Sequence, residues 1–366
     1  MAVSIVQGGE MRSMQVKRRL VILALILLTS FPLVSCDAIS TLVDRIGKAE
    51  TPTARPVETS SLPILERELS QYPFSLISDR LTVQMPVGAE DEAMQADAMS
   101  AQAPSKAETK LVLEADGKQL VLYAQETFYT TDDLEKDLDT ILKLRYGQGF
   151  TYTAEAVKQS GGGMKVIGFS PAQLDKSANS VLIQGAVVGI DDGAIVTIGV
   201  YATPETTADE DLCRKQAERI LSSIEPGSRK IVGKPHEERL GLNSLTIQLD
   251  KNYVVAQHEG QDFSVFYLMK YVKLGEPAPS IGIYIGAHPS MMYPQRGIQE
   301  SQLAKTEGKL LKKSVEWLSY EPNDGGYSAE TYLYLNDTLI MHIFVDAADE
   351  TEFETIRKMI QTLKIK

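Results

Sequence analysis

The sequence has few of the residues on which metal and redox chemistry depend. Only two of its 366 residues are cysteines, Cys36 and Cys213. If Cys36 carries a lipid, as argued below, no intramolecular disulfide can form and no zinc site can be built from cysteines. None of the four histidines forms a His-x-x-x-His or Glu-x-x-His pair. We therefore expect neither a metal nor another cofactor.

An excess of basic residues is also missing. The chain has 37 Lys and Arg against 49 Asp and Glu, which gives a net charge of −12. Its first 36 residues are basic on balance, so the remainder is still more acidic. Nucleic acids and anionic membrane surfaces require a basic contact area. We therefore expect neither of them as a direct partner of the folded part.

No apolar run is long enough to span a membrane. The longest one near the N-terminus, Leu20–Leu28, is well short of the ~20 residues that a transmembrane helix needs. It follows the basic residues Lys17–Arg19 and is closed by Pro32. This arrangement is typical of a secretory signal peptide, here residues 1–35. Translation could begin at residue 1, 11 or 14, since each is a methionine.

Leu33-Val34-Ser35-Cys36 resembles the bacterial lipobox. The resemblance implies that Cys36 receives a diacylglycerol and becomes the first residue of the mature chain. A lipid anchor with two or three chains would hold the protein on the extracytoplasmic side of the bacterial cell membrane, in the periplasm or at the cell exterior. An ordinary signal peptide with an incidental cysteine and an uncleaved anchor are the alternatives.

After Cys36 the chain is organised in four segments. Residues 36–62 are rich in Thr, Ser and Pro, which predicts a flexible tether. Residues 63–226 and 243–366 are each predicted to form a domain, and residues 227–242 to link them. An excursion at 87–110 without an apolar face is predicted to be a mobile loop.

Hydrophobic periodicity predicts strands and helices in the first domain. Leu81–Met85 alternates as a strand, and Asp116-Gly117 marks a hairpin between strands at 111–114 and 119–125. A helix capped by Thr131 and ended by Gly147 should follow. The remaining prediction is of strands at 152–157, 164–169, 181–190 and 194–201, and of a helix at 209–224.

The second domain has the same pattern in the same order. Leu245–Leu249 matches Leu81–Met85, a strand pair with an Asn336-Asp337 turn matches the pair at 181–201, and the amphipathic helix from Asp349 matches the helix at 209–224. Recurrence over this length indicates a duplicated domain. The predicted fold class is α+β, as two tandem copies of an antiparallel sheet flanked by helices.

This element order resembles the PsbP/DcrB-like superfamily. The resemblance is carried by the opening Leu-Thr-Val-Gln-Met strand, the antiparallel meander and the last hairpin that leads into a C-terminal helix. It implies an α/β/α sandwich for each copy. It also implies an accessory or binding protein without a catalytic residue set, and therefore not an enzyme.

Aromatic residues are unevenly distributed. The chain has one tryptophan and 15 tyrosines, most of them in the second copy, where an apolar-aromatic loop spans 287–294. Such side chains are enriched in binding surfaces. We predict that a groove for a ligand or partner is lined by Tyr284, His288, Met292, Tyr293 and Trp317. The alternative is that these aromatics cover half-buried strands.

The predicted function is that of a membrane-anchored, non-catalytic envelope lipoprotein that acts as a binding or assembly module. Its partner would be an envelope protein or a small ligand, neither of which the sequence identifies. One alternative is an envelope hydrolase that uses carboxylates between the two domains, which paired buried carboxylates with raised pKa values would favour. The other is a structural spacer, which requires no groove.

The lipid assignment predicts the behaviour of a cysteine variant. Replacing Cys36 by Ala should release the protein from the membrane fraction and abolish incorporation of labelled palmitate, because no thiol remains to be acylated. The variant Cys213→Ala is the control and should keep both properties. A Cys36→Ala protein that still sediments with membranes would refute the assignment.

Overall fold

The computed structural model describes residues 60–91, 107–240, 245–260, 262–322 and 325–365. These residues have a mixed α+β structure with mostly antiparallel sheets and few helices. The predicted signal peptide, Cys36 and most of the tether lie outside the described residues. The same holds for residues 92–106 of the predicted mobile loop.

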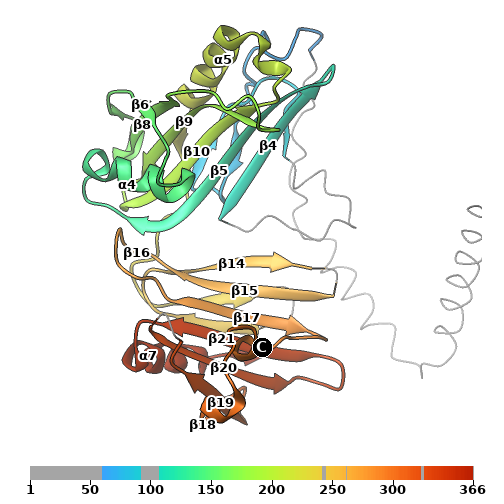
Figure 1. Ribbon diagram of the computed structural model, residues 1–366, viewed down its shortest axis with the longest axis vertical. Helices are drawn as coiled ribbons and strands as arrows, with labels where there is room; N and C mark the ends of the chain where they lie inside the picture. Colours follow the sequence, from blue (N-terminus) through green and yellow to red (C-terminus); the bar gives the residue numbers. More distant parts are fainter. Residues whose placement is uncertain (1–59, 92–106, 241–244, 261, 323–324, 366) are drawn as a thin grey trace, which may run out of the picture. The chain divides into compact units, whose positions relative to one another are not determined.

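The N-terminal half contains one large sheet (Figure 1). Its order is β3-β4-β5-β10-β9-β8-β6, and neighbouring strands are antiparallel. Short β7 also pairs with β8. The bounds are β3 Glu90–Asp91, β4 Glu108–Ala115, β5 Lys118–Thr130, β6 Tyr152–Ala154, β7 Lys158–Gln159, β8 Lys165–Pro171, β9 Val181–Gly189 and β10 Ala194–Ala202.

The predicted Asp116-Gly117 hairpin of this sheet is confirmed. Asp116 and Gly117 both have positive φ and join β4 to β5, as a tight hairpin requires. Asp191–Gly193 joins β9 to β10, and Gly161–Gly163 forms a 3₁₀ turn between β7 and β8. The predicted mobile loop ends earlier than expected, because residues 108–110 already belong to β4 and pair with β5.

Helices α4 (Leu134–Tyr146) and α5 (Glu210–Ser222) pack on opposite faces of this sheet. On β9, Val187 contacts the cluster under α4, while Ala186 and Val188 belong to the cluster under α5. The predicted cap of the first helix is corrected. Asp133 caps α4 by accepting a hydrogen bond from the Lys136 N–H. The Thr131 hydroxyl instead accepts from the Asp133 N–H, before the first residue of the helix.

The C-terminal half contains a second antiparallel sheet of order β14-β15-β17-β21-β20-β19-β18. The helix α7 (Glu350–Ile360) begins where predicted, after Asp349, whose side chain caps it. It buries Phe353, Ile356 and Ile360 against the sheet. The bounds are β14 Tyr253–Glu259, β15 Phe263–Lys270, β16 Val272–Lys273, β17 Ser280–Gly286, α6 Met292–Gln295, β18 Ala304–Leu310, β19 Lys313–Tyr320, β20 Tyr327–Tyr334 and β21 Ile340–Ala347.

Each half also has a small three-stranded sheet. In the first, β1 (Phe74–Leu76) and β11 (Glu225–Pro226) flank β2 (Leu81–Val83). In the second, β12 (His236–Leu240) and β22 (Lys364–Ile365) flank β13 (Leu245–Leu249). In both sheets the segment that follows the last helix returns to pair with the opening strand. Residues 236–240 of the predicted linker are therefore part of a sheet.

The two large sheets differ in how their second face is covered. The first sheet has α4 on one face and α5 on the other. Among the described residues of the second half, α7 covers one face, while the four-residue α6 and its flanking loop lie against part of the other. The expectation of a helix-covered sandwich is therefore corrected for this half, since the segment between β17 and β18 forms only α6 and the 3₁₀ turn Glu300–Gln302 and no counterpart of α4.

Within the described part of the chain, no helix combines the length and apolar character that crossing a bilayer would take.

The core contact between Phe353 and Trp317 predicts a change in stability. Both rings are buried and lie 5.4 Å apart, edge to face. Phe353→Ala should lower the free energy of unfolding by about 3–5 kcal/mol, because it leaves a cavity under α7. Tyr334→Ala, at a site that is 67% exposed, should change it by less than about 0.5 kcal/mol. Urea titration followed by the fluorescence of the single tryptophan measures both, and equal losses would contradict the prediction.

Candidate functional site

Four of the five predicted groove residues lie near one another on the outer face of the second sheet. Tyr284 is on β17, and its hydroxyl accepts a hydrogen bond from the backbone N–H of His288 at 3.3 Å. The backbone N–H groups of Met292 and Tyr293, at the start of α6, both donate to the carboxylate of Glu330 on β20. The loop between β17 and β18 is thus attached to the sheet through its backbone.

Glu330 is a buried carboxylate with several donors. Its Oε2 lies 2.9 Å from Nε2 of His342, whose ring is stacked on that of Tyr332 at a centroid distance of 4.3 Å. Burial acts to raise the pKa of Glu330, but the hydrogen bonds from His342 and from the loop backbone outweigh it and hold the pKa below its usual value. The group therefore holds the loop in place as a charged acceptor.

Trp317 does not lie with the other four residues. Its side chain is fully buried on the opposite face of the sheet, against Phe353 of α7. On β19 Trp317 is paired with Thr331, while its neighbour Leu318 is paired with Glu330 on the outer face. The prediction for Trp317 is corrected, because the alternation of a strand directs it into the core.

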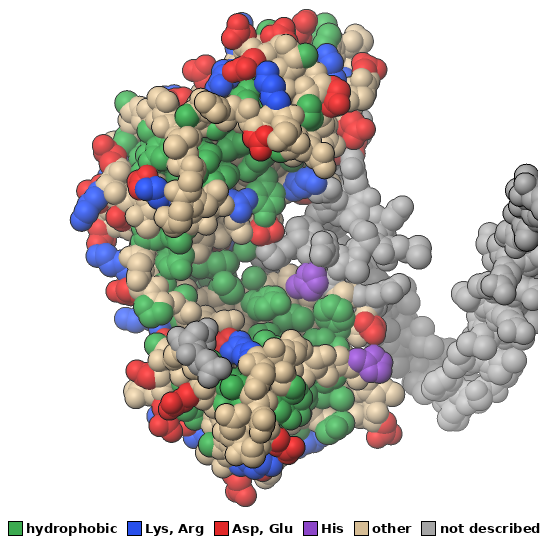
Figure 2. Space-filling model, in the orientation of Figure 1, with side chains coloured by type: hydrophobic (Ala, Val, Ile, Leu, Met, Phe, Trp, Pro, Cys, Tyr) green, Lys and Arg blue, Asp and Glu red, His purple; other side chains and the backbone are tan. Residues whose placement is uncertain are grey.

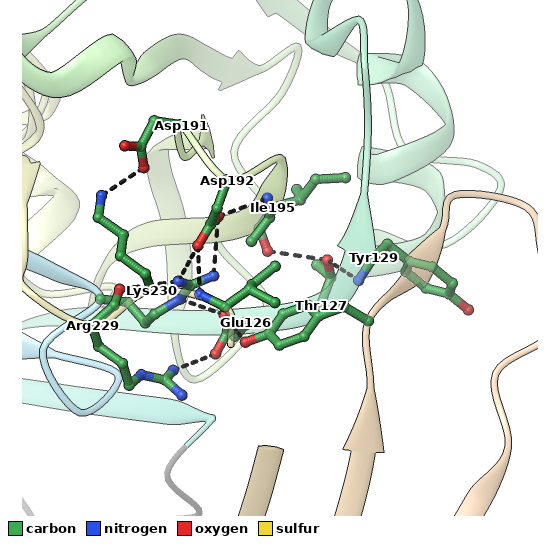
Figure 3. Close-up of polar contacts among 12 residues, drawn as sticks. Glu126, Thr127, Tyr129, Asp191, Asp192, Ile195, Arg229 and Lys230 are labelled. Carbon is green, nitrogen blue, oxygen red and sulfur yellow. Dashed lines mark hydrogen bonds and ion pairs between the residues drawn. The ribbon is translucent and has the colours of Figure 1, made fainter. Parts of the chain in front are cut away.

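A second site is formed around an irregularity in β5. Glu126 is paired with Val196 on β10, but Thr130 is paired with Ala194, so β5 has extra residues between these two pairs. Phe128, in this bulge, has a φ of 58°, a strained conformation for a non-glycine residue. The Thr127 hydroxyl donates to the Ile195 carbonyl and fixes the bulge on its neighbour (Figure 3). Bulges of this kind redirect side chains and are frequent at functional sites.

The bulge begins at Glu126, whose side chain is completely buried. One oxygen accepts from Nε of Arg80 at 2.7 Å and from the Tyr271 hydroxyl at 2.6 Å. The other accepts from Nη2 of Arg229 at 2.6 Å (Figure 3). These three donors come from residues 80, 229 and 271, so a single carboxylate holds three distant segments together.

Asp192 is a second carboxylate that pairs with Arg80. It accepts from Nη1 of Arg80 at 2.6 Å and from the backbone N–H of Ile231 at 2.8 Å. Burial acts to raise the pKa of Asp192, but these hydrogen bonds outweigh it and lower the pKa below its ordinary value. Paired carboxylates with raised pKa values would favour the hydrolase alternative, and the pKa of Asp192 is shifted in the opposite direction.

Strand β16 continues the contact between the halves. Val272 and Lys273 pair with Tyr129 and Thr130 of β5, in the parallel sense. The Thr130 hydroxyl donates to the Val272 carbonyl, and the ring of Tyr271 packs against that of Phe128 at 5.5 Å. The C-terminal half therefore contacts the first sheet at the bulge.

Beside the bulge lies a cavity of about 630 Å³. The hollow and the hydrophobic side chains gathered around it are visible in Figure 2. Its walls come from β4, β5 and α4 of the first half and from β14, β15 and the residue after β16 of the second. The lining residues are Ala107, Glu108, Gln125, Glu126, Thr127, Phe128, Tyr129, Ile141, Leu144, Arg145, Ala256, Tyr267, Met269 and Leu274.

This site was not predicted from the sequence. The apolar alternation of β5 stops at Gln125, and the charged Glu126 that follows it was the one local signal. Arg80, directly before a predicted strand, gave no sign that it is buried. These two side chains are buried because they pair with each other across more than 40 positions in the sequence. In the described ranges, no group of three or more His, Cys, Asp or Glu side chains could hold a metal ion.

Comparisons with known proteins give one similarity. No protein-family model matches the chain, and no curated protein matches it. Among solved structures it is similar to the solution structure of cyanobacterial PsbP (CyanoP) from Synechocystis sp. PCC 6803, with 10% sequence identity and a TM-score of 0.25. The match covers 37% of this chain and 94% of that one. A similarity at this level says nothing about the function of the chain.

The buried network predicts a large loss of stability from a small chemical change. Glu126→Gln should lower the free energy of unfolding by about 3–5 kcal/mol, because it leaves the buried guanidinium of Arg80 with only part of its counter-charge. The control is Asp132→Asn, which removes the exposed ion pair between Asp132 and Lys273 of β16 and should have little effect. Urea unfolding measures both, and a Glu126→Gln protein as stable as the control would show that the network is dispensable.

Proposed function

We propose that the protein is a membrane-anchored, non-catalytic envelope lipoprotein that binds a ligand with an apolar part in the cavity beside the β5 bulge. The observation that carries this proposal is the cavity itself. Ligand sites are typically concave, mostly apolar and about 300–1,000 Å³ in volume, with a small number of polar groups. The cavity of about 630 Å³ has these properties, with Phe128, Ile141, Tyr267 and Met269 among its lining residues.

The wall of the cavity is held by interactions that do not involve a ligand. Glu126 is fixed by three donors, and Thr127 is bonded to β10. A site whose supporting groups are already satisfied loses little conformational entropy when a ligand binds. This pre-organisation supports a binding role over that of a spacer, which needs no cavity.

We also propose that the two halves are tandem copies of a PsbP/DcrB-like domain. The strand orders support this, because β4-β5-β10-β9-β8 in the first sheet corresponds to β15-β17-β21-β20-β19 in the second. Helices α5 and α7 each follow the central hairpin directly, and each is followed by a strand that pairs with the opening strand of its half. Members of this superfamily are mostly accessory or binding proteins, which agrees with the proposed role.

The membrane location comes from the sequence alone. The basic n-region, the short apolar run and Leu33–Cys36 support a lipid on Cys36 and a tether up to about residue 62. A lipid-anchored binding module outside the cytoplasm would meet its ligand or an envelope partner near the membrane surface.

The proposed binding site can be tested with a neutral apolar dye, N-phenyl-1-naphthylamine, whose fluorescence rises in apolar surroundings. The wild-type protein should bind it at one site. Leu144→Glu places a charge at a cavity residue that is already 59% exposed, so the fold should tolerate it. It should weaken dye binding about tenfold or more, because apolar contact is lost and a carboxylate is desolvated.

The matched control is Leu62→Glu, which changes an equally apolar side chain that is 48% exposed and does not line the cavity. It should bind the dye as the wild type does. Absence of dye binding in the wild type, or equal binding by Leu144→Glu and the wild type, would contradict the proposed site.

A further inference from the structure

Among the residues that the structure describes, one cation lines the cavity and has no acidic partner. Arg145 lies in the last turn of α4, and its guanidinium is 5.0 Å from the ring centre of Tyr123 and 5.7 Å from that of Tyr146. A helix C-terminus stabilises a cation, so this position alone indicates no site. The aromatic rings, however, hold the guanidinium at the cavity wall, and the two phenols that contact it are uncharged, so its positive charge is not neutralised.

Four arginines of the same half, unlike Arg145, form ion pairs. Arg80, Arg214, Arg219 and Arg229 each contact a carboxylate, at distances of 2.5–2.9 Å. Arg145 makes no ion pair with an Asp or Glu side chain anywhere in the described ranges. Its neighbour Lys143 is paired with Asp139, so that carboxylate is already engaged. The charge of Arg145 is therefore available to a ligand.

The two acids that line the cavity are already satisfied. Glu126 accepts from Arg80, Arg229 and Tyr271. Glu108 accepts from the amide of Gln125 at 2.9 Å and from the Tyr123 hydroxyl. Burial and the hydrogen bond to Glu108 raise the pKa of Tyr123 to about 12, so this phenol remains a neutral donor. A cationic ligand would have to displace these donors, whereas an anionic one would not.

The surface next to Arg145 is apolar. Leu144 and Ile141 lie on the same helix, and Tyr267 and Met269 of β15 line the cavity as well. A ligand that fills this space and also reaches the guanidinium needs an apolar body and a negative end. Guanidinium groups bind carboxylates and phosphates with two parallel hydrogen bonds.

We propose that the ligand is a single-chain amphiphile with an anionic head group, bound by Arg145 through the head and by the cavity through the tail. This inference rests on the proposed function, because it specifies which ligand the cavity binds. The head group is a carboxylate or a phosphate, as in a fatty acid or a monoacyl phospholipid, and the two sources share the chemistry that Arg145 recognises.

The experiment compares amphiphiles that share a twelve-carbon chain, each below its micelle concentration, by displacement of N-phenyl-1-naphthylamine. The probes are dodecanoate, dodecyl phosphate, neutral dodecanoylglycerol and dodecyltrimethylammonium. The wild type should bind at least one anionic probe about tenfold tighter than the neutral one, and the cationic probe most weakly. The preferred anion distinguishes the carboxylate source from the phosphate source.

The variant Arg145→Gln should abolish the preference for an anion and leave the affinity for dodecanoylglycerol unchanged. The control Arg219→Gln, on α5 and outside the cavity, should keep the wild-type preference. Equal displacement by all four probes, or a preference that survives Arg145→Gln, would overturn the head-group inference while leaving the binding site intact. Failure of every probe to bind would instead refute the proposed function.

Discussion

The described structure depends on the buried carboxylate of Glu126. Its oxygens accept from Arg80 directly before β2, from Arg229 in the segment after β11 and from Tyr271 directly before β16. A buried charge is tolerated only where its hydrogen-bonding capacity is satisfied. Removing one donor would leave the others with unbalanced charge, so these segments are coupled. The network also fixes the strained bulge, and with it one wall of the cavity.

The charged residues that line the cavity differ in whether they have a partner of opposite charge or a hydrogen-bond donor. Two acids line it, and both already accept hydrogen bonds from neighbouring side chains. The guanidinium of Arg145 is instead held over two aromatic rings. An acidic chain can thus present a local site for an anion, because the net charge of a protein does not determine the sign of a single pocket. The outer face of the second sheet is different, since its carboxylates Glu330 and Asp346 hold the loop at residues 292–296.

Regular elements were predictable because their signals are local. The Asp116-Gly117 hairpin, the Gly147 helix end and the Asp349 cap are encoded within a few residues, and the structure has each of them. Errors arose where a local signal had competitors. Thr131 and Asp133 are both good caps, and the helix begins at the second. Trp317 belongs to a residue type common in binding surfaces, but its strand position places it in the core, where Phe353 covers it.

By itself, the sequence determined the strand and helix order of the first half, the last hairpin and helix of the second, the acidic balance of the chain and the motif around Cys36. Each of these depends on composition or on neighbours in the chain. Only the tertiary structure decided which polar side chains are buried together. Arg80 and Glu126 lie 46 positions apart, and Tyr271 lies 145 positions beyond Glu126. No periodicity or spacing encodes such a contact, since it exists only after two sheets have folded and come together. The cavity, with Arg145 in its wall, likewise exists only after the two sheets have come together.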